Sequence, residues 1–125
     1  MGVLLAMLNI TETERRSLLR YFPSAQFSQH YIRIPNFRLP SDEFIPRAVD
    51  LLISIRIGAE PQVYVPRELF CLRGGNHHLD FDTEAEMAQK GWKKLCIKKT
   101  WTPQHGLMSV LNMVQDFFRE LGNEV

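Results

Sequence analysis

The carboxy-terminal stretch carries the pattern that most restricts how this chain can fold. Between residues 107 and 121, apolar side chains recur at intervals of three and four, and Gly122 follows them. This spacing puts them on one face of a helix, and glycine is common just past a helix end. We expect that face to pack on a sheet. Its members are Leu107, Val110, Leu111, Val114, Phe117, Phe118 and Leu121.

A second periodicity predicts the sheet itself. From Ala48 to Ile57, apolar residues occupy every second position, which indicates a central strand with one core-facing side, ended by Gly58. Shorter runs at 27–34, 62–65 and 69–72 predict further strands, and the prolines at 35, 40 and 46 predict an extended connection between them. The core-facing side of the central strand consists of Val49, Leu51, Ile53, Ile55 and Ile57.

A helix is expected ahead of these strands. Thr11 and Glu14 fit a capping box, in which the hydroxyl and the carboxylate both bind free amides at the helix start. The helix should run to about Tyr21 and be stopped by Pro23. Its outward face carries three basic residues, Arg15, Arg16 and Arg20.

The order of the elements indicates the fold class. A turn is expected at Gly74 and Gly75, and the acidic segment 80–89 predicts an exposed loop or a short helix over residues 84–90. A helix, consecutive strands, a long connection and a last helix predict an α+β fold with an antiparallel meander of about four strands.

Length and charge limit the function classes. A chain of 125 residues fits one domain over residues 1–125, and 15 basic against 14 acidic residues leave no basic field for nucleic acid or an acidic membrane surface. The apolar start at residues 2–8 is too short to span a membrane or serve as a signal sequence. Two cysteines are no disulfide framework, so we interpret both as reduced thiols of a cytoplasmic protein.

Cys96 is the residue most readily expected to act as a nucleophile. It lies among Lys93, Lys94, Lys98 and Lys99, and positive charge around a half-exposed thiol favours the nucleophilic thiolate. The alternative is that it is a small buried apolar residue, as most lone cysteines are.

Cys96 is followed by Trp101, Pro103 and the amphipathic helix. This arrangement resembles the catalytic cysteine, Trp-Ser-Pro segment and following helix of the ubiquitin-conjugating enzyme fold. Segments 34–40, 50–53 and 91–103 more closely resemble the diverged bacterial members of that superfamily, which occur beside ubiquitin-like proteins, activating enzymes and deubiquitinases. Trp101 and Pro103 would support the site structurally rather than react.

The resemblance implies a thioester carrier that needs no cofactor. Its partners would be an activating enzyme and a ubiquitin-like protein, whose carboxy terminus would pass to Cys96 and then to an amine. Asn76 or His78 would donate to the oxyanion or position the reacting groups, if the acidic segment 80–89 folds outward. Cys71 is the second choice for the nucleophile, and the arginines of the first helix resemble the face that engages the activating enzyme.

A metal site is not favoured by the spacing. A structural zinc site needs four converging ligands, usually in short paired clusters, and the chain has no such pairs. The residues weighed for this role are Cys71, His77, His78, Asp80 and Asp82. His77 and His78 are also interpretable as an ordinary loop pair.

Three function classes follow. The presence of Cys96 favours an active conjugating enzyme. A Cys96-to-Trp101 interval shorter than usual in the family, and an Asn76 motif without the family's proline, favour a noncatalytic scaffold that binds the ubiquitin-like protein or its activating enzyme. A third class is a general α+β binding domain unrelated to ubiquitin.

Overall fold

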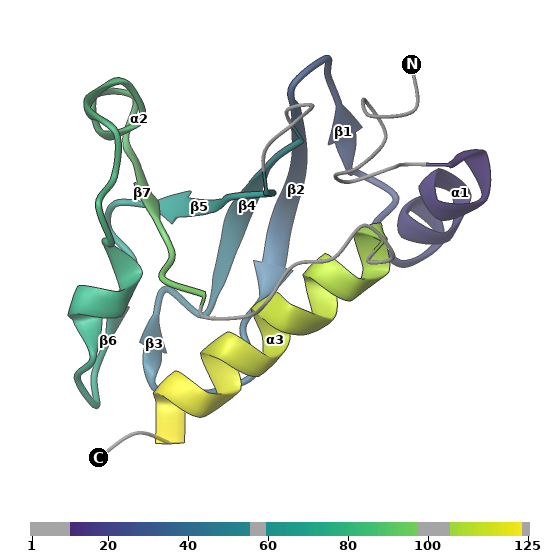
Figure 1. The fold of residues 1–125 in the computed structure, drawn as a ribbon. Coiled ribbons are helices and arrows are strands. Elements are labelled where there is room, and N and C mark those ends of the chain that lie inside the picture. The colour runs from purple at the N-terminus through teal and green to yellow at the C-terminus, as the bar shows by residue number, and fades with distance from the viewer. Residues whose placement is uncertain (1–10, 56–59, 98–105, 124–125) are drawn as a thin grey trace.

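The centre of the molecule is a five-stranded antiparallel sheet (Figure 1). The structure, a computed structural model, describes residues 11–55, 60–97 and 106–123. Along the sheet the strands are ordered β1 (Gln26–Phe27), β2 (Tyr31–Arg38), β4 (Ala48–Ser54), β5 (Val63–Pro66) and β7 (Trp92–Lys94).

Shorter elements surround this sheet. A separate two-stranded ribbon joins β3 (Phe44–Ile45) to β6 (Phe70–Cys71). The helices are α1 (Glu12–Tyr21), a 3-10 helix η2 (Asn76–Leu79), α2 (Ala85–Gln89) and α3 (Leu107–Asn123). Among the described residues, no helix has the length and apolar character needed to cross a membrane.

Helix α3 covers one face of the sheet, which we call the inner face (Figure 1). The alternating residues of β4 and the apolar stripe of α3 are buried together in one core, as the two periodicities predict. Phe118 of α3 lies edge-on to Phe44 of β3, with ring centroids 5.2 Å apart, so the core extends under the ribbon. The α+β class with an amino-terminal and a carboxy-terminal helix is therefore confirmed.

The opposite, outer face is polar. Strand registers align one row across four strands, from Arg33 through Leu52 and Tyr64 to Lys94. Since successive side chains of a strand alternate between faces, this row lies opposite the core residues. The short helix α2 packs beside β7 and places Met87 over Tyr31, whose hydroxyl donates to the Met87 sulfur at 3.8 Å.

Several boundaries differ from the sequence predictions. The run 27–34 is not one strand, because Ser28 Oγ accepts the Tyr31 N–H in a turn that separates β1 from β2. Pro35 lies within β2, where an irregular register between Ile34 and Phe37 accommodates it and Asn36 takes a positive φ of 56°. Within the described residues the sheet has five strands rather than about four, since the run 27–34 supplies both β1 and β2 and β7 joins an edge. The predicted strand at 69–72 is present as β6, but it pairs with β3 in the separate ribbon and not with this sheet.

The predicted helices are all present, and one of their predicted ends is wrong. The short helix expected within the acidic segment is present as α2, and α1 ends at Tyr21 as predicted. The carboxy-terminal helix, however, continues through Gly122 to Asn123. Ile57 and Gly58, predicted at the end of the central strand, lie outside the described residues.

The capping box at the start of α1 is only half realised. Thr11 Oγ1 accepts the Glu14 N–H at 3.1 Å, as predicted. The Glu14 carboxylate instead accepts the N–H of Leu107, the first residue of α3. A carboxylate of one helix therefore caps the start of another, where the free amides and the helix dipole favour negative charge.

Candidate functional site

Cys96 is held between the sheet and η2 by its main chain. The neighbouring Leu95 N–H donates to the Val63 carbonyl at 2.9 Å, which extends the pairing of β7 with β5. The Cys96 N–H turns to the other side and donates to the His78 carbonyl at 2.8 Å. A residue 18 positions earlier in the chain thus lies directly beside the candidate nucleophile.

This contact is possible because the acidic segment 80–89 folds away from Cys96 and the chain then returns to the sheet as β7. The Phe81 N–H donates to the Lys94 carbonyl and the Lys94 N–H to Thr83 Oγ1, both at 2.9 Å. Between these two anchors and β7 the chain forms α2. The outward fold on which an approach of His78 to Cys96 depends is therefore present.

Asn76 has a different set of contacts. Its side-chain oxygen accepts the Cys71 N–H at 2.7 Å, and its amide group donates to the Cys71 carbonyl at 2.9 Å. These bonds tie η2 to β6 after the turn at Gly74 and Gly75, both of which have positive φ. In this structure the Asn76 amide thus supports the turn that carries His78.

The two cysteines differ in their surroundings. Cys71 has no exposed surface and belongs to the apolar core. Cys96 is 9% exposed and lies outside that core cluster. The half-exposed setting expected for Cys96 is wrong, since most of its surface is covered, yet it remains the more accessible of the two thiols.

The lysines beside Cys96 have partners of their own. Lys93 Nζ donates to the Leu69 carbonyl, and burial lowers the pKa of this lysine, partly opposed by Asp80 and Glu68. Lys94 Nζ lies 3.8 Å from a Glu84 carboxylate oxygen on the outer face. Lys98 and Lys99 fall outside the described residues. The two described lysines therefore direct their charges to groups other than Cys96.

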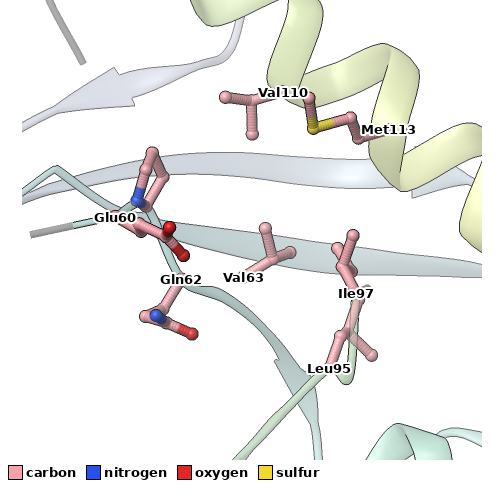
Figure 2. A pocket seen from close by; sticks show the side chains of 8 residues that line it. Glu60, Gln62, Val63, Leu95, Ile97, Val110 and Met113 are labelled. Atoms are coloured by element: carbon pink, nitrogen blue, oxygen red, sulfur yellow. The ribbon is translucent and has the colours of Figure 1, made fainter. Parts of the chain in front are cut away.

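An apolar groove begins beside Cys96. Leu95 and Ile97, which flank it in the chain, line one side, and Val110 and Met113 of α3 line the other (Figure 2). Val63 lies between them, and Glu60 and Gln62 stand at one end in the same view. The cavity volume is about 80 Å³.

A larger cavity of about 290 Å³ lies on the outer face, and sequence reasoning missed it. Its lining comes from four strands (β2, β4, β5 and β7), from α2 with the residue before it, and from the segment before β5. The sequence feature that could have indicated this cavity is the alternation in β4 and β5. It assigns Ser54 and Tyr64 to the face opposite the core residues. The lining residues are Tyr31, Ser54, Glu60, Gln62, Tyr64, Glu84, Glu86, Met87 and Lys94.

The remaining candidates lie apart from Cys96 or beyond the described residues. Arg15, Arg16 and Arg20 are exposed on α1, as predicted. Arg15 lies over the Phe27 ring at 5.2 Å, and Arg16 pairs with Glu12 at 3.4 Å. Trp101 and Pro103 are outside the described residues, so their predicted structural role stays a prediction.

The histidine pair does not assemble a metal site with its neighbours. The rings of His77 and His78 lie against each other with centroids 3.9 Å apart and their planes tilted by 42°. Within residues 11–55, 60–97 and 106–123, no group of three or more His, Cys, Asp or Glu side chains is placed to hold a metal ion.

Comparison with protein-family models, with curated proteins and with solved structures finds no significant match to this chain.

Proposed function

We propose that the chain is a cytoplasmic conjugating enzyme for a ubiquitin-like protein, which carries the modifier as a thioester on Cys96. The proposal rests on the resemblance of residues from Tyr31 onward to the bacterial conjugating-enzyme-like group. It is also compatible with the α+β fold, because Cys96 follows the last strand of the sheet and precedes α3.

One observation carries the proposal further than the sequence does. The hydrogen bond from the Cys96 N–H to the His78 carbonyl brings the turn containing Asn76 and His78 to the candidate nucleophile. A thioester carrier needs polar groups near its sulfur to position the acyl group and stabilise its oxyanion. We propose that the partly exposed side chain of His78, whose main chain contacts Cys96, takes that role.

The proposed reaction has two acyl transfers. In the first, the Cys96 thiolate attacks the modifier's terminal carbonyl carbon, a new carbon–sulfur bond forms, and the thiolate of the activating enzyme leaves. In the second, an amine nitrogen attacks the same carbon, the Cys96 thiolate leaves, and the amine proton passes to solvent. The activating enzyme is proposed to bind through acidic groups on its own surface to Arg15, Arg16 and Arg20 of α1.

A second function is favoured by the burial of Cys96 and by the contacts of Asn76. A thiol that is 9% exposed and an amide engaged by the Cys71 backbone also suit a noncatalytic scaffold. Such a protein would bind the ubiquitin-like protein or its activating enzyme without forming a covalent bond.

The two functions separate in a reconstituted assay. The chain is incubated with ATP, a bacterial activating enzyme and its ubiquitin-like protein, and products are resolved with and without reductant. We expect a reducible adduct in the wild type and in Cys71→Ala, and none in Cys96→Ala. His78→Ala should slow the transfer without abolishing the adduct. The variant keeps the Cys96 thiol, and the carbonyl of residue 78 still accepts the Cys96 N–H.

Each other outcome has a definite meaning. Loss of the adduct only in Cys71→Ala would transfer the role of nucleophile to that residue. Binding of the modifier without any adduct would establish the scaffold. Absence of both binding and adduct would leave the third class, a binding domain unrelated to ubiquitin.

A further inference from the structure

The outer-face cavity has a floor formed by residues of the sheet and a wall formed by α2. Tyr31, Ser54 and Tyr64 belong to β2, β4 and β5, while Met87 lies on α2. Its volume of about 290 Å³ is enough for a small side chain or a small organic molecule. The thioester proposal does not use this cavity.

The floor contains a buried hydroxyl that has no hydrogen-bond partner within the part of the chain that the structure describes. Ser54 is only 6% exposed and is the buried polar residue of the described chain. Its N–H donates to the Gln62 carbonyl at 2.8 Å, but its hydroxyl has no hydrogen-bond partner among the described residues. Leaving a buried hydroxyl unpaired is unfavourable, and a polar ligand atom in the cavity would satisfy it.

The charges around the cavity favour a cation. The Tyr64 hydroxyl donates to the Glu84 carboxylate, whose two oxygens lie 2.9 and 3.0 Å from it. One of these oxygens is 3.8 Å from Lys94 Nζ. Glu86 pairs with Lys90 at 3.2 Å. Glu60 has no ion-pair partner within the described part of the chain. Lys94 and Lys90 offset the charges of Glu84 and Glu86, so Glu60 makes the described charges around the cavity net negative.

The apolar part of the lining suits methylene groups. Met87 is nearly buried, and its sulfur accepts the Tyr31 hydroxyl. A thioether and an aromatic ring adapt readily to an aliphatic stem. The cavity therefore joins an apolar wall to a negative rim and an unpaired hydroxyl.

We propose that the outer-face cavity binds a primary alkylammonium group. The ammonium would lie near Glu60 and donate to Ser54 Oγ, and its stem would contact Met87 and Tyr31. The same chemistry is offered by a free alkylamine and by a lysine side chain of a polypeptide. This inference goes beyond the thioester proposal and does not depend on it.

The test is a titration of the isotope-labelled chain followed by two-dimensional NMR. The probe is Nα-acetyl-lysine methylamide, and the matched control is Nα-acetyl-norleucine methylamide, which lacks the ammonium. We expect the lysine probe to bind with a Kd on the order of 1 mM, typical of a ligand with few buried atoms. The backbone signals of Ser54, Tyr64 and Met87 should move, and the norleucine control should leave them unchanged.

Variants locate the site. Glu60→Gln should weaken binding about tenfold because a charge-assisted contact is lost, and Ser54→Ala about threefold. Glu120→Gln removes an exposed carboxylate of α3 and should have no effect. Equal binding of the two probes, equal loss in Glu120→Gln, or no signal change at the three named residues would overturn the proposal.

A second arm distinguishes the two sources of the ammonium. n-Pentylamine and a lysine-containing pentapeptide are titrated under the same conditions. Equal affinity of n-pentylamine and the acetyl-lysine probe supports a free amine as the ligand. Tighter binding of the peptide, lost when its lysine is acetylated, supports a polypeptide partner. Failure of both to compete with the acetyl-lysine probe would contradict the site.

Discussion

The two faces of the sheet are built by the same strands and have opposite characters. On the inner face, Leu51 and Ile53 of β4 are fully buried in the core beneath α3. On the outer face of the same strand, Leu52 is paired with Arg33 and Tyr64, and Ser54 lines the cavity beside α2. Alternation lets one strand stabilise the fold on one side and present a ligand-sized cavity on the other.

The sharpest test of this comparison uses two adjacent leucines. Leu51→Ala should lower the free energy of unfolding by about 3 kcal/mol, because it leaves a void in a close-packed core. Leu52→Ala, which removes a partly exposed side chain, should cost about 1 kcal/mol. Urea unfolding followed by circular dichroism measures both losses. Equal losses would mean that the two faces contribute alike to stability.

A second test concerns the starts of the helices on the two faces. The first residue of α3 is capped by Glu14, whereas the start of α2 has no side-chain cap. Glu14→Ala should therefore cost about 1 to 2 kcal/mol of unfolding free energy. Gly106→Ala should cost at most a similar amount, because a Cβ at this position would displace the flexible Glu14 carboxylate from the Leu107 N–H.

The double variant provides the control. In the Glu14→Ala background, Gly106→Ala should have little further effect, because the group it collides with is gone. Additive losses in thermal or urea unfolding would show that the two residues act independently.

Loss of a polar contact on the outer face should have a smaller effect. Tyr64→Phe removes the hydroxyl that contacts Glu84 but keeps the ring, so we expect a loss of about 1 kcal/mol. Glu84 is half exposed and regains water when the contact is lost. Chemical denaturation measures the change, and a loss as large as that of Leu51→Ala would contradict the assignment of stability to the inner face.

The smallest effect is expected from pH. The Arg33 guanidinium, which donates to Asp50 at 2.8 Å, and the Asn36 N–H hold the pKa of the Asp50 carboxyl below its usual range, against the opposing effect of burial. The pair thus stabilises the fold above the unfolded pKa of about 3.9, and this contribution is lost as pH falls through the lower folded pKa.

Because a third of the Asp50 side chain is exposed, we expect the contribution to be about 0.5 kcal/mol. The unfolding free energy of the wild type and of Asp50→Asn should therefore differ at pH 6 and converge toward pH 2. A difference that persists at low pH would assign the effect to something other than this ionisation.

The sequence predicted the elements whose patterns are long. The stripe of α3 and the alternation of β4 each extend over several repeats, so local irregularities do not hide them. Strand β7 has three residues and two lysines, and its pairing with β5 depends on the rest of the sheet. Pro35 by itself predicts a break, yet a bulge allows the strand to continue through it.

The candidate site was predictable only in part. The sequence singled out Cys96 and the turn with His78, but their contact depends on the path of the intervening acidic segment. The Asn76 amide and the lysine side chains lie against partners that no local pattern reveals. The outer cavity requires four strands and a helix to come together, and only the face of each strand residue could be inferred beforehand.

The bond between Glu14 and Leu107 also bears on the order of folding. It joins residues 93 positions apart, whereas the Arg33–Asp50 pair between β2 and β4 closes only 17. Loop closure costs more entropy as the loop grows, and contacts near in sequence form sooner. The strand pairs should therefore assemble before α1 docks, and α1 should be the first element whose amide hydrogens exchange when the native protein opens locally.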